Sequence, residues 1–138
     1  MDLAQRAQAT QKVVARYRGK PATWSVVRCI KLARAQGKAL GHELPPIPAV
    51  RSALGVKKAL KKQRCESVED LLDKYFERLP SPAFAVVGDL VMLPSEDGLG
   101  AVCIADGHGC MIGWHDAHPE GLSNITLSDA EVGCAWRA

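Results

Sequence analysis

The sequence predicts an α+β fold, in which N-terminal helices pack on a C-terminal antiparallel sheet. Over residues 3–79 the apolar side chains recur at the spacing of amphipathic helices. From residue 84 onward, short apolar runs are separated by glycines, a pattern typical of strands and tight turns. With 138 residues, 47% of them hydrophobic, the chain is long enough for one domain with a single core over residues 1–138.

Two helices are expected before the proline-rich part of the chain. An apolar stripe over residues 3–17 predicts the first, and residues 24–36 form a second periodic segment. Gly37 and Gly41 open the connection that follows this second helix. The segment Leu44-Pro-Pro-Ile-Pro48 favours extended backbone, because each proline disfavours helix in the residue before it.

Two shorter helices are expected next. The first covers residues 56–63, with Ala59 and Leu60 facing inward. The second runs to Leu79 and opens with Ser67-Val-Glu-Asp70, which resembles a capping box with Asp in place of Glu. A charge run on the outer side of the first helix is more typical of a solvated face than of a phosphate site. It consists of Lys57, Lys58, Lys61 and Lys62.

Strands are expected in the second half of the chain. Leu90–Leu93 and Ala101–Ala105 are short apolar runs, and Cys110–Trp114 follows as a return strand. Asp106-Gly-His-Gly109 predicts a tight hairpin turn, because two glycines permit the positive φ that such turns require. Ala135–Arg137 is expected as a short last strand. The strands would form an antiparallel meander behind the helices.

Composition excludes several classes of function. A net charge of +3 is too weak to indicate a nucleic-acid partner or an anionic membrane surface. No apolar run is long enough for membrane insertion. Residues 1–10 are polar and alanine-rich, so no secretory signal is expected and the chain would fold in the cytoplasm, unless it leaves as part of a larger particle.

Neither a cofactor nor a metal is predicted from the cysteines and histidines. Five cysteines without paired spacing are expected to be reduced and to pack as small hydrophobic side chains. His115-Asp-Ala-His118 could be a metal pair or a displaced base with its carboxylate, but the interval from Cys110 to His115 matches no zinc pattern. Polar loop residues after a strand are the favoured interpretation.

Cys29 is the candidate nucleophile of the chain. It lies early in the second predicted helix, where the positive end of the helix dipole favours a thiolate. Cysteine catalysis also requires a general base within hydrogen-bonding distance of the sulfur. His108 and His115 are weak candidates for that base. His108 lies at the hairpin tip and His115 directly after the return strand, so both belong to the strand pair next to the expected site.

An ordered series of short motifs carries a resemblance to a known family. The series is Trp24 with Cys29, Gly55-Val-Lys-Lys-Ala-Leu60, Gly88-Asp-Leu-Val91, Gly100-Ala-Val-Cys-Ile104 with Gly107, and Ala135-Trp-Arg137. It resembles small phage and prophage tail proteins that are similar to NlpC-type, papain-like cell-wall peptidases and amidases. The resemblance covers most of the chain and implies a papain-like fold.

The resemblance also assigns positions of the active site. Cys29 matches the catalytic cysteine, although Arg28 replaces the preceding acid and Ile30 the following serine. Gly88-Asp89 matches the pair that begins the first strand after the helices. Ala101 stands where the active enzymes have the catalytic histidine, and alanine cannot accept the proton of a thiol.

The resemblance and the missing base together imply a protein without peptidase activity. We expect a structural or assembly component of a phage tail tip or baseplate, present in the virion and in the host cytoplasm during assembly. Its partners would be hub, distal tail or fibre proteins, with peptidoglycan as a possible ligand. The alternative is an active cysteine hydrolase that cleaves peptidoglycan peptides with Cys29 and a displaced histidine. A third hypothesis is a module that binds a peptide or glycan in the same cleft.

Three tryptophans provide candidate contact surfaces. Trp24, Trp114 and Trp136 are candidates to line a glycan groove, but large aromatic side chains more often fill a core or anchor an interface. Trp114 and Trp136 are the interface candidates, and Trp136 is the stronger because it lies close to the last residue of the sequence.

Overall fold

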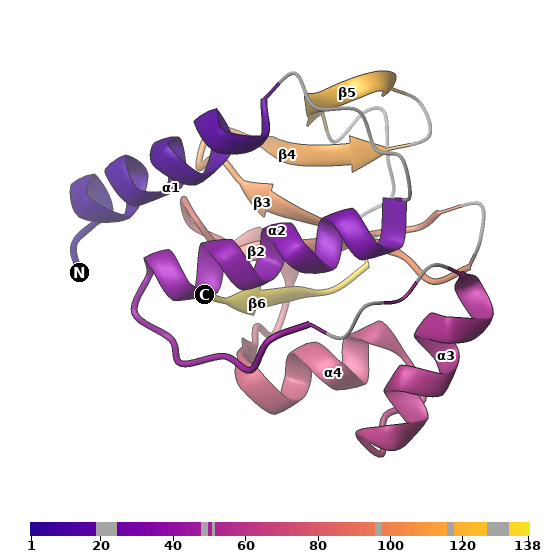
Figure 1. The fold of residues 1–138 in the computed structure, drawn as a ribbon. Helices are drawn as coiled ribbons and strands as arrows, with labels where there is room; N and C mark the ends of the chain where they lie inside the picture. The colour runs from indigo at the N-terminus through magenta and orange to yellow at the C-terminus, as the bar shows by residue number, and fades with distance from the viewer. Residues whose placement is uncertain (19–24, 48–49, 51, 96–97, 116–117, 127–132) are drawn as a thin grey trace.

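The computed structural model describes residues 1–18, 25–47, 50, 52–95, 98–115, 118–126 and 133–138 (Figure 1). In this part of the chain, four α-helices precede all the strands of a six-stranded sheet. The helices are α1 (Leu3–Tyr17), α2 (Ser25–Ala39), α3 (Ala53–Lys62) and α4 (Val68–Tyr75). This order of helices and strands confirms the predicted α+β class.

The sheet is antiparallel throughout, with the order β1-β6-β2-β3-β4-β5. Its strands are β1 (Glu77–Arg78), β2 (Leu90–Leu93), β3 (Ala101–Ala105), β4 (Cys110–His115), β5 (His118–Thr126) and β6 (Ala135–Arg137). A short 3-10 helix, η1 (Pro82–Phe84), lies between β1 and β2. The predicted strands at β2, β3, β4 and β6 are confirmed, as is the turn between β3 and β4, where Gly107 and Gly109 both have positive φ.

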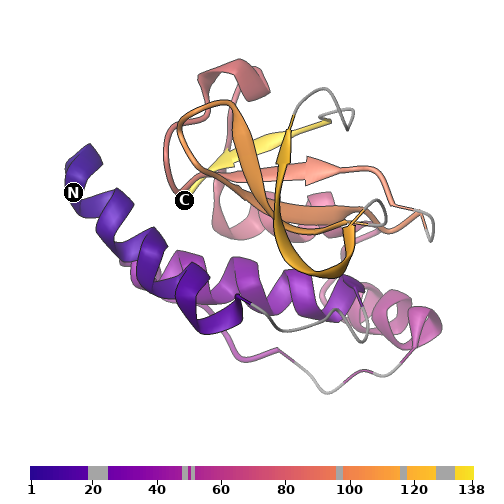
Figure 2. The same ribbon diagram turned by 90° about the horizontal axis from the view of Figure 1, so that it is seen from above.

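The core has two parts, one on each face of the sheet. α1 and α2 lie along one face (Figure 2), and Val102 and Ile104 of β3 pack with helix residues there. The alternate β3 residues, Ala101, Cys103 and Ala105, belong to a second cluster built from strand side chains. This alternation follows from the two-residue repeat of a strand, whose successive side chains point to opposite faces.

The second helix is longer than its sequence pattern predicts. α2 continues through Gly37 to Ala39, and Gly41, with φ +99°, ends it. The expectation that Gly37 stops the helix is therefore wrong. A Cβ at Gly37 would lie 2.7 Å from Leu44 Cδ1 and 2.8 Å from Phe76 Cζ, so this glycine allows close packing against α2 rather than a turn.

The fourth helix is shorter than predicted. α4 ends at Tyr75, and the residues expected to continue it to Leu79 form β1 instead. Glu77 and Arg78 pair with Arg137 and Trp136 of β6, the last strand of the chain. Pairing between segments so distant in sequence overrides the local helical pattern, which cannot encode it.

The longest strand was not predicted. β5 covers residues 118–126, of which the sequence analysis assigned only His118, to a polar loop, and its register with β4 shifts between Gly113 and His115. The interpretation of His118 as a loop residue is therefore wrong. The sequence pattern does not indicate this strand, because Pro119 and Gly121 are both unfavourable in strand interiors. Within the described residues, no helix is long and apolar enough to cross a membrane.

Candidate functional site

Cys29 lies inside the core. It is the fifth residue of α2, only 1% exposed, and it belongs to the helix-side cluster together with Val13 and Leu32. Burial raises the pKa of the neighbouring thiol of Cys103 far above its usual range, and the charge of Cys29 contributes a smaller increase. The sulfur that the sequence marks as a nucleophile is therefore closely packed among apolar side chains.

Ala101 lies in the other part of the core. It begins β3, and its side chain belongs to the strand-side cluster with Leu93 and Ile125 rather than to the cluster that contains Cys29. The structure therefore assigns the predicted nucleophile and the position of the missing base to different apolar clusters. Both positions are buried.

The four histidines lie on three different segments of the fold. His42 packs edge-on against Phe76, with 4.9 Å between ring centroids, and His108 is exposed at the tip of the β3–β4 hairpin. His115 ends β4 and pairs through the backbone with His118 of β5. The side chains of His115 and His118 lie outside the described part of the structure, as does Asp116. The proposed pairing of His115 with a carboxylate stays a prediction.

His108 lines a groove of about 790 Å³ that also includes Thr10 of α1 and Asn124 of β5. Asp106, at its edge, accepts hydrogen bonds from the backbone N–H of His108 (2.7 Å) and of Cys110 (3.1 Å). These bonds fix the turn rather than orient an imidazole. Apolar side chains of α1 and of residues 85–87 form most of the groove wall, and the buried sulfur of Cys29 is not among its lining groups.

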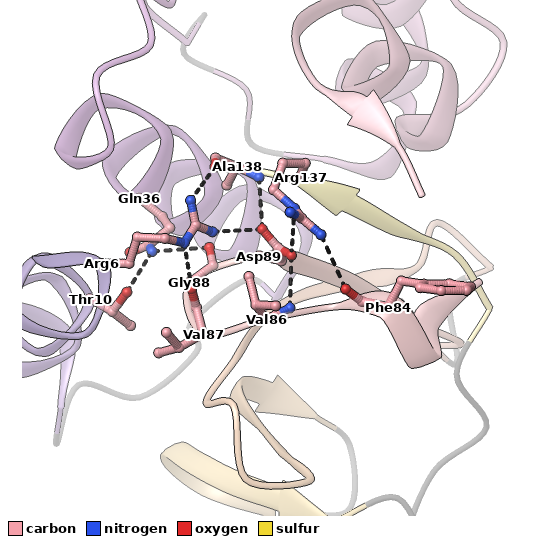
Figure 3. A network of polar contacts seen from close by, with 10 residues as sticks. All are labelled: Arg6, Thr10, Gln36, Phe84, Val86, Val87, Gly88, Asp89, Arg137 and Ala138. Carbon is pink, nitrogen blue, oxygen red and sulfur yellow. Dashed lines mark hydrogen bonds and ion pairs between the residues drawn. The ribbon is translucent and has the colours of Figure 1, made fainter. Parts of the chain in front are cut away.

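The best-defined polar site is built around Asp89, whose side chain is fully buried (Figure 3). Its carboxylate lies 2.6 Å from Arg6 Nη2 of α1 and 3.0 Å from Arg137 Nε of β6. It also accepts hydrogen bonds from the backbone N–H of Val86 (2.9 Å) and Ala138 (3.1 Å). A buried carboxylate needs such partners, because an unpaired charge in the interior is costly.

Arg6 extends this network to two carbonyls. Its Nε donates to the Val87 carbonyl (2.9 Å) and its Nη1 to the Ala138 carbonyl (2.8 Å), in addition to the ion pair with Asp89 (Figure 3). One guanidinium thus joins the first helix, the turn before β2 and residue 138. The resemblance includes the Gly88-Asp89 pair and Arg137 in separate motifs, but nothing in the sequence indicated that Arg137 and Arg6 meet at Asp89. The one general expectation that could have suggested such partners is that a buried carboxylate requires cations nearby.

Gly88 brings a second part of the network into contact with α1 and α2. Gln36, fully buried on α2, donates from Nε2 to Thr10 Oγ1 (2.9 Å) and to the Gly88 carbonyl (3.1 Å). Gly88 has φ +92°, and a Cβ there would lie 3.0 Å from Thr10 Oγ1 and 3.1 Å from Gln36 Nε2. The Gly-Asp pair is therefore a packing and anchoring element in this chain.

The two tryptophans proposed as interface anchors are core residues. Trp114 is 1% exposed, and Tyr17 packs edge-on against it with 5.9 Å between ring centroids. Trp136 is fully buried and donates from Nε1 to Asp73 Oδ1 (2.8 Å). Neither ring presents surface to a partner, so the alternative role in the core is the correct one for both.

Asp73 also forms an exposed ion pair with Arg78. The guanidinium donates through Nε and Nη2 to the two carboxylate oxygens, each at 2.9 Å. Hydrogen bonding from Arg78 lowers the pKa of Asp73, and the indole of Trp136 adds to this effect. The pair joins the end of α4 to β1 and β6.

The polar network around Asp89 anchors α1 and β6 to the turn before β2. Among the residues that the structure describes, no three His, Cys, Asp or Glu side chains are grouped so that they could hold a metal ion. The Asp89 carboxylate is engaged by Arg6, by Arg137 and by two backbone N–H groups (Figure 3).

Comparison with known proteins places the chain at the level of a family. No curated protein matches the sequence. A family model described as "Domain of unknown function (DUF6950)" matches residues 1–138, the full length of the sequence. The chain therefore belongs to the DUF6950 family.

Proposed function

We propose that the chain is a catalytically silent, papain-like domain of the NlpC type that acts as a structural or assembly component of a phage tail tip or baseplate. The main support for the absence of catalysis is the burial of Cys29, which is only 1% exposed. The arrangement of α2 against an antiparallel sheet, with Cys29 early in the helix, supports the papain-like part of the proposal.

The burial of Cys29 argues against peptide hydrolysis. Acyl transfer requires the sulfur to contact the carbonyl carbon of the substrate, with an acceptor for its proton nearby. Cys29 belongs to the apolar helix-side cluster. Ala101, which the resemblance aligns with the catalytic histidine, has no side-chain proton acceptor and belongs to the other cluster. Arg28 cannot replace a base, because a guanidinium remains protonated.

The anchored ends of the fold support a scaffold role. Arg6 ties α1 to the backbone carbonyl of Ala138, and the buried Asp89 holds both Arg6 and Arg137. A domain fixed in this way presents a constant surface to hub, distal tail or fibre proteins. In this proposal the protein resides in the virion tail and passes through the host cytoplasm during assembly.

Composition of purified particles tests the tail assignment. We expect mass spectrometry of gradient-purified virions to find the chain in a fixed ratio to the other tail proteins. Its absence from particles, with normal abundance in the lysate, would contradict a structural role in the virion.

Thiol labelling tests catalytic silence. In native protein, peptide-resolved iodoacetamide labelling should be about 100-fold slower at Cys29 than at the half-exposed Cys134, because the buried thiol reacts only after local opening. Labelling at equal rates in urea is the control. Fast native labelling of Cys29, together with release of cell-wall fragments that Cys29→Ala abolishes, would establish the hydrolase instead.

A further inference from the structure

The small net charge of the chain conceals an uneven distribution of charged side chains. Residues 3–42, which include α1 and α2, contain nine basic side chains and no acidic one. The rest of the chain contains nine basic and fifteen acidic side chains. The first two helices therefore carry a concentrated positive charge, which attracts anionic groups even though the whole protein is only weakly basic.

Four of these cations line a groove of about 630 Å³ between the end of α1 and α2. Arg16 belongs to α1. Lys31, Arg34 and Lys38 recur at three- and four-residue intervals, so they lie along one face of α2. Among the described residues that line the groove, none is acidic. Like charges at this spacing repel one another, so an anion bound in the groove would relieve an unfavourable interaction.

Three of the four cations are available to a ligand. Arg16, Lys31 and Lys38 are exposed, and their side chains form no ion pair or hydrogen bond with the described residues. Arg34 is held at the edge of the groove, because its Nε donates to the Pro45 carbonyl (2.7 Å). Arg16 and Lys38 also lie in the last turns of their helices, where the helix dipole favours a cation. Lys31, in the middle of α2, has no such role.

We propose that this groove binds a short acidic segment of a partner protein that also carries an apolar side chain. The carboxylates of such a segment would pair with the exposed cations of the groove. Apolar groups form the remainder of the wall, and they would contact the apolar side chain of the ligand. These groups belong to Tyr17, Ala35, Ala39, Pro46 and Ile47. The inference does not depend on the tail assignment, nor on any reaction at Cys29.

The lining favours a peptide over a nucleic acid. Proteins bind single strands by stacking bases on aromatic side chains. The one aromatic residue among the described lining residues is Tyr17, and its ring already packs edge-on against Trp114. A long polyanion would also extend beyond the groove toward the rest of the chain, where acidic side chains are in excess and would repel it. A short acidic segment avoids this repulsion.

Fluorescence anisotropy with the full chain tests the site. The probe is a labelled peptide in which glutamate alternates with serine around a central leucine, and its binding should weaken as salt is added, because exposed charges are screened. Lys31→Gln combined with Lys38→Gln should weaken binding about five- to tenfold, since two exposed ion pairs are lost. The matched control is Lys58→Gln combined with Lys62→Gln, which removes the same charge from the exposed face of α3 and should leave the affinity nearly unchanged.

Further probes keep the test decisive. The same peptide with glutamine in place of glutamate should not bind, and inorganic phosphate at equal ionic strength should not displace the acidic peptide. Arg16→Gln removes a groove cation from α1 and replaces the α2 double variant if that protein does not fold. The proposal is overturned if the acidic peptide does not bind, or if the α2 and α3 double variants lose affinity equally. An oligothymidine of equal charge that binds as tightly as the peptide would overturn it in favour of a nucleic-acid site, and displacement by phosphate in favour of a small-anion site.

Discussion

At the scale of single residues, Gly88 shows why the Gly-Asp pair is needed apart from any catalysis. Its φ of +92° is costly for residues with a side chain, and its position allows Gln36 and Thr10 to approach the backbone. We expect Gly88→Ala to lower the free energy of unfolding by about 2–4 kcal/mol, since strain and crowding add. Urea denaturation measures this change.

Gly41 provides the matched control for that substitution. Its φ of +99° is nearly the same, but no atom lies within 4 Å of the Cβ that alanine would add. Gly41→Ala should therefore cost only the backbone term, about 1–2 kcal/mol. Equal losses in the two variants would show that the contacts of Gly88 contribute nothing.

At the scale of elements, β3 and β4 pack closely because Gly113 faces Cys103. A Cβ at Gly113 would lie 2.5 Å from the sulfur of Cys103, well inside van der Waals contact. We expect Gly113→Ala to destabilise the protein by about 1–3 kcal/mol. Cys103→Ala removes the sulfur, so the double variant should recover about 1–2 kcal/mol relative to the sum of the single changes.

The outcome of that double-mutant cycle distinguishes two causes. Coupling between the substitutions locates the damage at the contact between the two strands. Additive losses would instead mean that Gly113 is required for its own backbone, for example at the register shift between Gly113 and His115. Thermal or urea unfolding of the four proteins gives the coupling energy.

Helix caps were partly predictable at the same scale. Ser67 is the N-cap of α4 and accepts a hydrogen bond from the backbone N–H of Asp70 (3.1 Å), as the sequence indicated. The carboxylate of Asp70, however, accepts from Glu66 N rather than from the N-cap residue. A complete capping box occurs at the start of α1, between Asp2 and Gln5, where the sequence analysis did not predict one.

At the scale of the whole molecule, Asp89 connects the beginning of the chain to its last strand. Asp89→Asn removes the charge that pairs with Arg6 and Arg137, and Arg6 is left largely buried. Breaking a buried ion pair in this way costs about 3–5 kcal/mol. We expect a loss of this size in the free energy of unfolding, measured by urea denaturation.

Asp73→Asn is the control for the removal of a charge. Asp73 and Arg78 form an ion pair whose side chains are 39% and 43% exposed, and such surface pairs contribute about 0–1 kcal/mol. The amide of asparagine retains an oxygen that can accept the indole N–H of Trp136. If Asp89→Asn and Asp73→Asn lowered the free energy of unfolding by the same small amount, the network at Asp89 would not stabilise the fold.

The sequence alone determined the α+β class, most element positions and the hairpin between β3 and β4, because periodicity and turn chemistry are local. It did not determine β1 or β5, whose pairing depends on segments elsewhere in the chain. Only the tertiary structure decided that Cys29, Trp114 and Trp136 are buried and that Arg6 and Arg137 meet at Asp89. Burial and ion pairing depend on which surfaces meet in three dimensions, and one sequence does not specify those contacts locally.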